Sequence, residues 1–146
     1  MEDWEIEELD IKPNDKKIRC ENNNGEIEEV DCVYPATVMT AVFGKIYDAE
    51  CQRKVIEYIN KQQGLTLCIE NILDDIEKEF GLGHILQFYY IQNRTINEIA
   101  KLTHKTPKRV YNLICAGLRR LRHPRFSRTL AKFMPLIDEE GDVSKQ

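Results

Sequence analysis

Two closely spaced helix-start signals constrain this chain more than any other feature. Thr95 is followed three residues later by Glu98, which is the pattern of a capping box at a helix N-terminus. Thr106 is a second N-cap, and Pro107 occupies the first helical position, which proline favours. Apolar residues recur at helical spacing after both signals until His123-Pro124, where the proline disfavours further helix. The pattern predicts two helices joined by a three-residue turn, the spacing of a helix-turn-helix.

The charge of the same stretch indicates what these helices do. Residues 99–137 contain no Asp or Glu. An ordinary helical hairpin, the less favoured alternative, usually mixes charges of both signs on its solvated face. A field of one sign suits a polyanion, because neutralised phosphates release condensed counterions. DNA binding is therefore the expected function of this stretch. Its ten basic residues are Lys101, Lys105, Lys108, Arg109, Arg119, Arg120, Arg122, Arg125, Arg128 and Lys132.

The net charge of the whole chain hides this asymmetry. The formal charge is only −4 at pH 7. Residues 1–98 carry 10 basic and 21 acidic side chains, whereas residues 99–137 carry 10 basic and none that is acidic. The overall acidity does not argue against nucleic-acid binding, because the distribution of charge matters more than its sum.

Other classes of function find little support in the sequence. Five widely spaced cysteines form no CxxC pair or Cys/His cluster, which predicts free thiols in a reducing compartment and no metal site. No phosphate-binding glycine loop, HExxH motif or nucleophile arrangement is present, so we expect neither catalysis nor a cofactor. No apolar run approaches the ~18 residues of a membrane span, and the N-terminus lacks a signal peptide. We expect a cytoplasmic protein without membrane association.

The N-terminal residues are dominated by acids. The run Asn22-Asn23-Asn24-Gly25 is a turn signal that would close a weak hairpin between residues 17–21 and 26–30. A lone hairpin is marginal in water, so disorder is an equally good expectation. We interpret this arm as a solubilising tail, and competition with DNA for the basic third is the less favoured alternative.

Periodicity predicts four further helices between the arm and the helix-turn-helix. They cover residues 33–44, where a strand is the alternative, and residues 46–63, 67–80 and 85–91. The predicted fold is all-α, with a C-terminal helix-turn-helix preceded by several short helices and an acidic N-terminus that is poorly ordered or a weak hairpin. The expected division is an acidic arm (1–32), a helical segment of unassigned role (33–66), the helix-turn-helix domain (67–134) and an acidic tail (135–146).

Residues 95–134 resemble region 4 of the bacterial sigma-70 factors, especially the primary sigma group. The first helix of that family carries a TLEEIA-type sequence, which is TINEIA at residues 95–100 here. The second helix ends in an ALRKLRHP-type run, which is GLRRLRHP at residues 117–124. The family's chain closes with a serine, a leucine and a phenylalanine, matched here by Ser127, Leu130 and Phe133. The LRRLRHP run with this tail behind it is the specific part of the match.

The resemblance implies promoter DNA and RNA polymerase as partners. In the family, the second helix enters the major groove of an upstream promoter element, and an apolar surface nearby binds the flap of the polymerase β subunit. Carried over by position, the base-reading residues are Pro107, Lys108, Tyr111 and Asn112. The residues expected at the DNA backbone are Thr95, Ile96, Lys105, Arg109, Arg119, Arg120 and Arg122. The first two would bind a phosphate through free backbone N–H groups at the helix start.

Several positions depart from the family pattern. The base-reading positions usually hold Arg, Glu, Arg and Gln, and only Asn112 keeps an amide able to read adenine. Residues 1–66 contain no counterpart of region 2, which binds core polymerase and melts the promoter. We therefore expect a sigma-like or partial sigma factor, of bacterial, phage or mobile-element origin, that binds double-stranded DNA with RNA polymerase. The alternative is a sigma mimic that binds polymerase or its regulators through protein contacts, without specific DNA binding.

Overall fold

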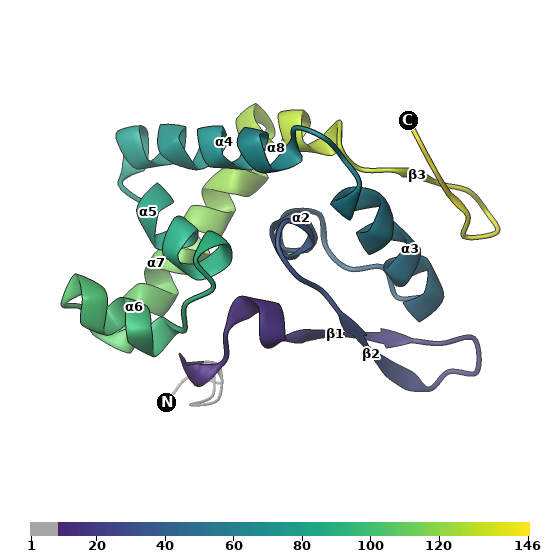
Figure 1. Ribbon diagram of the computed structural model, residues 1–146, viewed down its shortest axis with the longest axis horizontal. Coiled ribbons are helices and arrows are strands. Elements are labelled where there is room, and N and C mark those ends of the chain that lie inside the picture. Colours follow the sequence, from purple (N-terminus) through teal and green to yellow (C-terminus); the bar gives the residue numbers. More distant parts are fainter. Residues whose placement is uncertain (1–8) are drawn as a thin grey trace.

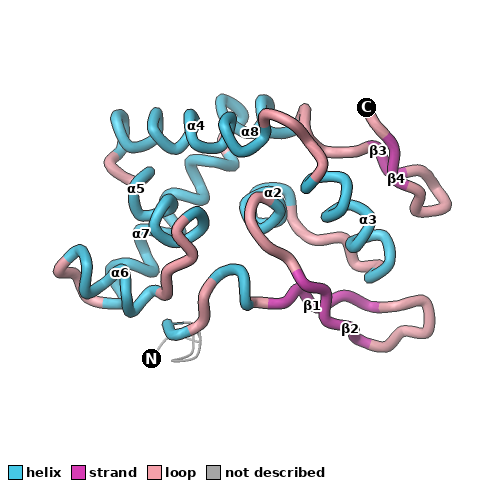
Figure 2. Tube along the Cα trace, in the orientation of Figure 1, coloured by secondary structure: helices cyan, strands magenta, loops and turns pink. Residues whose placement is uncertain are grey.

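Helices make up most of the chain (Figures 1 and 2). The computed structural model describes residues 9–146, so the acidic arm expected over residues 1–32 lies partly outside the described residues. The helices expected over 33–44, 46–63, 67–80 and 85–91 are confirmed, with shifted ends. The helical elements are η1 (a 3-10 helix, Pro13–Asp15), α2 (Ala36–Phe43), α3 (Ala49–Asn60), α4 (Leu65–Phe80), α5 (Gly83–Leu86), η2 (a π-helix, Gln87–Ile91), α6 (Ile96–Thr103), α7 (Pro107–Arg122) and α8 (Pro124–Ala131).

The all-α expectation is incomplete, because the chain also forms two small antiparallel sheets. Strands β1 (Lys17–Glu21) and β2 (Ile27–Asp31) form the hairpin that the asparagine-rich turn predicts. The side chain of Asn22 closes the turn by accepting hydrogen bonds from the backbone N–H groups of Asn24 and Glu26, at 2.9 and 3.0 Å. A hairpin that is marginal alone is stable here because it buries Cys20 and Val30 against α3.

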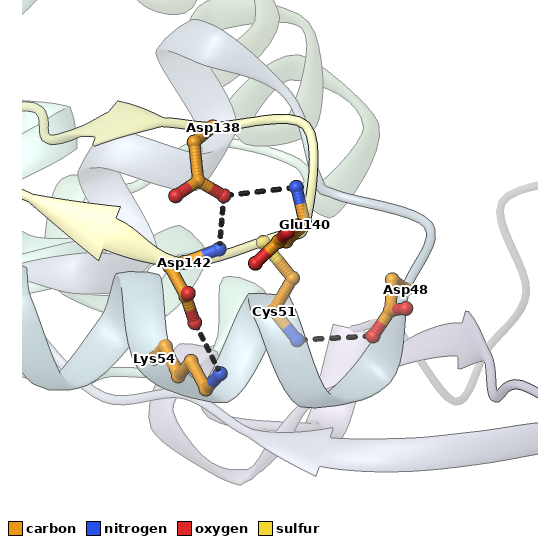
Figure 3. A network of polar contacts seen from close by, with 6 residues as sticks. All are labelled: Asp48, Cys51, Lys54, Asp138, Glu140 and Asp142. Atoms are coloured by element: carbon orange, nitrogen blue, oxygen red, sulfur yellow. Dashed lines mark hydrogen bonds and ion pairs between the residues drawn. The ribbon is translucent and has the colours of Figure 1, made fainter.

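The C-terminal residues, expected to be an acidic tail, fold into a second hairpin. Strands β3 (Leu136–Ile137) and β4 (Val143–Ser144) are joined by an acidic turn. The carboxylate of Asp138 accepts hydrogen bonds from the N–H groups of Glu140 and Asp142, at 2.9 and 2.8 Å (Figure 3). An ion pair between Asp142 and Lys54, at 3.4 Å, ties this turn to α3 (Figure 3).

One hydrophobic core runs through the N-terminal and C-terminal halves. Helix α4 contributes a stripe that includes Ile69, Leu73 and Ile76, all essentially inaccessible to solvent. Burying each such side chain contributes about 1.5–3 kcal/mol. Helices α4 and α8 lie side by side along one edge of the molecule, and α7 runs from them toward α6 (Figure 1). Helix α7 also packs on α2, so the segment before residue 67 belongs to the same core.

A tight connection sets the position of α6. Gly83 begins α5, and a Cβ atom there would lie 1.9 Å from the carbonyl oxygen of Leu73, so only glycine allows α5 to approach α4 this closely. The π-helix η2 follows, and Asn93 then adopts a left-handed conformation, with φ of 54°. The side-chain oxygen of Asn93 accepts a hydrogen bond from the backbone N–H of Asn14 at 3.1 Å. No helix within residues 9–146 is long and apolar enough to cross a membrane.

Candidate nucleic-acid interface

Helix α6 begins with the predicted capping box. The hydroxyl of Thr95 accepts from the backbone N–H of Glu98 at 3.0 Å, and the Glu98 carboxylate accepts from the N–H of Thr95 at 3.1 Å. The hydrogen bond from the Thr95 backbone is the main reason that the pKa of Glu98 lies below its ordinary value. The N–H of Thr95 is therefore not free, which departs from the expectation that it binds a phosphate. The side chain of Ile96 is buried in the core.

The three residues between α6 and α7 turn the chain sharply. His104 adopts a left-handed conformation, with φ of 56°, and the N–H of Lys105 donates to the carbonyl of Ala100 at 3.0 Å. The hydroxyl of Thr106 then caps α7 by accepting from the N–H of Arg109 at 3.1 Å. Ala100 is small and buried, which lets the two helices approach each other. The helix, turn and helix expected here are therefore present as local structure.

The inner face of α7 fixes which side chains can point outward. Val110, Ile114, Gly117 and Leu121 follow one another at helical spacing and are all buried. A Cβ atom at Gly117 would lie 2.8 Å from the side chain of Leu86, so α7 packs directly on α5 at this point. This packing sets the rotation of α7 about its own axis.

The opposite face of α7 carries three exposed polar residues that line up along the helix axis. At 100° per residue, Lys108, Asn112 and Arg119 all lie on the side away from the buried stripe, and each is exposed. They span about 16 Å along the helix, at about 1.5 Å per residue. Pro107 and Tyr111, the other two predicted base-reading residues, are half-buried on the flank. We call Lys108, Asn112 and Arg119 the outward row.

The ten basic side chains of the stretch fall into distinct groups. Seven of them are exposed and, within residues 9–146, form no ion pair or hydrogen bond. Two of the seven, Arg128 and Lys132, lie on α8 and at its end. We call the other five, on α6, the turn and α7, the open cations: Lys101, Lys105, Lys108, Arg109 and Arg119. Lys101 lies on α6 and was not among the predicted contact residues. Its position next to the turn signal, within the stretch without acids over residues 99–137, was the available clue.

A second group of arginines is engaged within the protein. The guanidinium of Arg122 donates twice to the carbonyl of Ala41 in α2, at 3.1 and 2.8 Å. Arg120 stacks on the ring of Phe80, 4.1 Å from the ring centroid. Both were predicted to contact the DNA backbone, and the structure gives them contacts that join α7 to α2 and to α4. No local sequence pattern signals these contacts, because their partners lie far away in the chain.

Arg125 belongs to the same engaged group. It forms a bidentate ion pair with Glu79, with N–O distances of 2.6 and 2.7 Å. The neighbouring carboxylate raises the pKa of the Arg125 guanidinium. The pair ties the start of α8 to the end of α4, although residue 125 sits in the stretch without acids.

Acidic groups also lie at the start of α6. The carboxylate of Asp10 accepts a hydrogen bond from the side-chain amide of Asn97, in the first turn of α6. With Glu98, this places two carboxylates where the resemblance predicts a phosphate. The face that is most open to a polyanion is therefore the outward row with the turn, rather than the start of α6.

Within residues 9–146, no group of three or more His, Cys, Asp or Glu side chains is arranged to hold a metal ion. His104 and His123 both have capping positions: His104 ends α6, and the ring of His123 accepts from the N–H of Arg125 at 3.1 Å at the start of α8. The chain matches no protein-family model, and the comparisons found no curated protein or solved structure that matches it.

Proposed function

We propose that this protein is a DNA-binding transcription factor of the sigma region 4 type, which binds promoter DNA together with RNA polymerase. The observation that carries the proposal is the outward row of α7 beside the open cations, in a stretch without acids. Asn112 offers an amide that can pair with adenine in two hydrogen bonds, and Lys108 can donate to the acceptors of guanine. Arg119, Lys105 and Arg109 supply charge for phosphates.

The first experiment measures DNA binding by the full-length chain as salt is varied. Each phosphate neutralised contributes about −0.9 to the slope of log affinity against log salt, so five open cations give at most about −4 to −5. The probe is a pool of random-sequence duplexes followed by selection of the bound fraction, because the preferred sequence is unknown. Lys61→Ala is the control for loss of a surface charge, since Lys61 pairs with Glu57 on α3, outside the proposed interface. Absence of salt-dependent binding at low salt would reject DNA binding.

The proposed partnership with RNA polymerase rests on the resemblance and on a cleft with a mixed polar and apolar lining. Between α4 and α8 lies a cleft of about 460 Å³ whose lining includes Leu67, Ile72 and Phe126. Leu67 is 61% exposed, although it is a large apolar residue. We infer that this cleft is the surface for the flap of the β subunit. Leu67→Asp should prevent co-purification with core polymerase, whereas Lys61→Ala should leave it unchanged. Equal recovery of both variants would reject the cleft as the polymerase contact.

The second candidate is a sigma mimic that binds polymerase or its regulators without specific DNA binding. The carboxylates of Asp10 and Glu98 at the start of α6 favour it, because they repel phosphate from this end of the helix. Polymerase binding without salt-dependent DNA binding would support the mimic. Steep salt dependence with a selected sequence would support the DNA-binding factor.

A further inference from the structure

A small cavity lies apart from the outward row of α7. It has a volume of about 210 Å³ and forms where the start of β1, helix α2 and the π-helix η2 meet. Its wall is mostly apolar and includes Ile18, Ala41 and Tyr90. This volume equals about seven water molecules at ~30 Å³ each, which suits a ligand of a similar number of non-hydrogen atoms.

Two hydrogen-bond donors meet in the wall of this cavity. The ammonium of Lys16 donates to the hydroxyl of Tyr89 at 2.7 Å and lies 5.5 Å from the centroid of the same ring. Both residues line the cavity. Within residues 9–146, no carboxylate pairs with Lys16 and no group accepts from the hydroxyl of Tyr89. The neighbouring Lys17, by contrast, pairs with Asp31 at 3.6 Å.

Both donors lie in a mostly apolar wall and, among the described residues, lack an acceptor of the kind that such groups normally have. Tyr89 is only 5% exposed, and a buried tyrosine hydroxyl normally donates its proton as well as accepting one. Lys16 is half-buried and brings a positive charge to an apolar wall. A charge in such a place is stabilised by an anion that accepts from it. The ligand that completes the site therefore has an anionic acceptor for both donors and an apolar body for the rest of the wall.

We propose that this cavity binds a small carboxylate with an apolar body, held by Lys16 and Tyr89. One carboxylate oxygen accepts from the ammonium and the other accepts from the tyrosine hydroxyl. The apolar body packs on Ile18, Ala41 and the ring of Tyr90. The site shares no residue with the proposed DNA-binding surface, so it does not depend on that function.

Benzoate is the probe for this proposal, titrated into the full-length chain by calorimetry and by NMR. For a ligand of this size we expect saturable binding with a Kd on the order of 1 mM and shifts of the Ile18 methyl signals. Benzyl alcohol has the same ring without the charge, and inorganic phosphate has the charge without the ring. Both should bind about tenfold more weakly than benzoate, because benzyl alcohol lacks the charged acceptor and phosphate lacks the apolar ring.

Variants test which residues hold the carboxylate. Lys16→Gln should weaken benzoate binding about tenfold or more, because it removes the charged donor. Tyr89→Phe keeps the ring and its burial while removing the hydroxyl, so it tests the second donor in a folded protein. Lys12→Gln removes a nearby exposed charge that does not line the cavity and should leave binding unchanged. No saturable benzoate binding, equal binding of benzyl alcohol or phosphate, or equal weakening by Lys12→Gln would each overturn the proposal.

Discussion

Arg119 and Arg122 are three positions apart on α7, yet we expect their replacement by alanine to change two different properties of the protein. The side chain of Arg119 is exposed in the outward row and forms no hydrogen bond or ion pair within residues 9–146. The guanidinium of Arg122 donates to the carbonyl of Ala41 at 3.1 and 2.8 Å and so joins α7 to α2. Arg119→Ala should therefore affect DNA binding, and Arg122→Ala should affect stability.

The magnitudes follow from the contacts. Each hydrogen bond contributes about 0.5–1.5 kcal/mol net, so losing both at an exposed site costs about 1–2 kcal/mol of unfolding free energy. At about 4 °C per kcal/mol for a chain of this size, the Tm of Arg122→Ala falls by several degrees. Arg119→Ala should leave stability within about 0.5 kcal/mol, because exposed side chains without partners contribute little. It should make the salt slope of DNA binding about one unit shallower, and equally so for all sequences.

Thermal unfolding and salt-dependent anisotropy on the same protein samples separate the two effects. Arg128→Ala is the matched control, because Arg128 is exposed and, within residues 9–146, has no side-chain partner. It should change neither Tm nor the salt slope, because Arg128 lies on α8, outside the outward row and the open cations. Arg122→Lys should recover part of the lost Tm, since an ammonium can still donate to the carbonyl. If Arg122→Ala kept the wild-type Tm and made the salt slope as shallow as Arg119→Ala does, the structural role of Arg122 would be refuted.

Three further predictions concern other parts of the fold. Lys108→Ala combined with Asn112→Ala should flatten the sequence preference more than it weakens overall binding; an unchanged selection profile would show that these residues do not read bases. Gly83→Ala should lower the free energy of unfolding by about 3 kcal/mol or more, because the new Cβ would clash with a backbone carbonyl; denaturation with urea measures it, and a shift below about 0.5 kcal/mol would contradict the close approach. Glu98 has a pKa below its ordinary value of 4.5, so its contribution to stability is present above pH 4.5 and lost as pH falls through the lowered pKa. The stability difference between wild type and Glu98→Gln should therefore vanish in acid, and a difference that persists there would argue against a charged cap.

Local signals in the sequence predicted the helical part of the fold well. The N-caps at Thr95 and Thr106 and the apolar stripe of α7 are short-range features, and their geometry depends on residues within one or two turns. The turn residues around Asn22 likewise predicted where the first hairpin would lie. They did not decide between that hairpin and disorder. The second hairpin was not predicted, because its short strands carry too little periodicity and gain their stability from contact with α3.

The division of the basic residues could not be predicted from the sequence. Charge counting identifies ten cations, but it gives all of them the same role. Only the fold brings Ala41 to Arg122, Phe80 to Arg120 and Glu79 to Arg125. These partners lie tens of positions away in the chain, and no periodic pattern links residues at such separations. Within residues 9–146, packing leaves the open cations, together with Arg128 and Lys132, without a hydrogen bond or ion pair.

The sequence by itself determined where α6 and α7 begin, which face of α7 is apolar, and that residues 99–137 carry charge of one sign. Each of these properties depends on residue type and short-range spacing, which the chain has before it folds. The tertiary structure decided which cations face solvent, that Asp10 and Glu98 occupy the start of α6, and that Lys16 and Tyr89 meet at a cavity. Those outcomes depend on contacts between distant segments, which form only when burial of the common core brings the segments together.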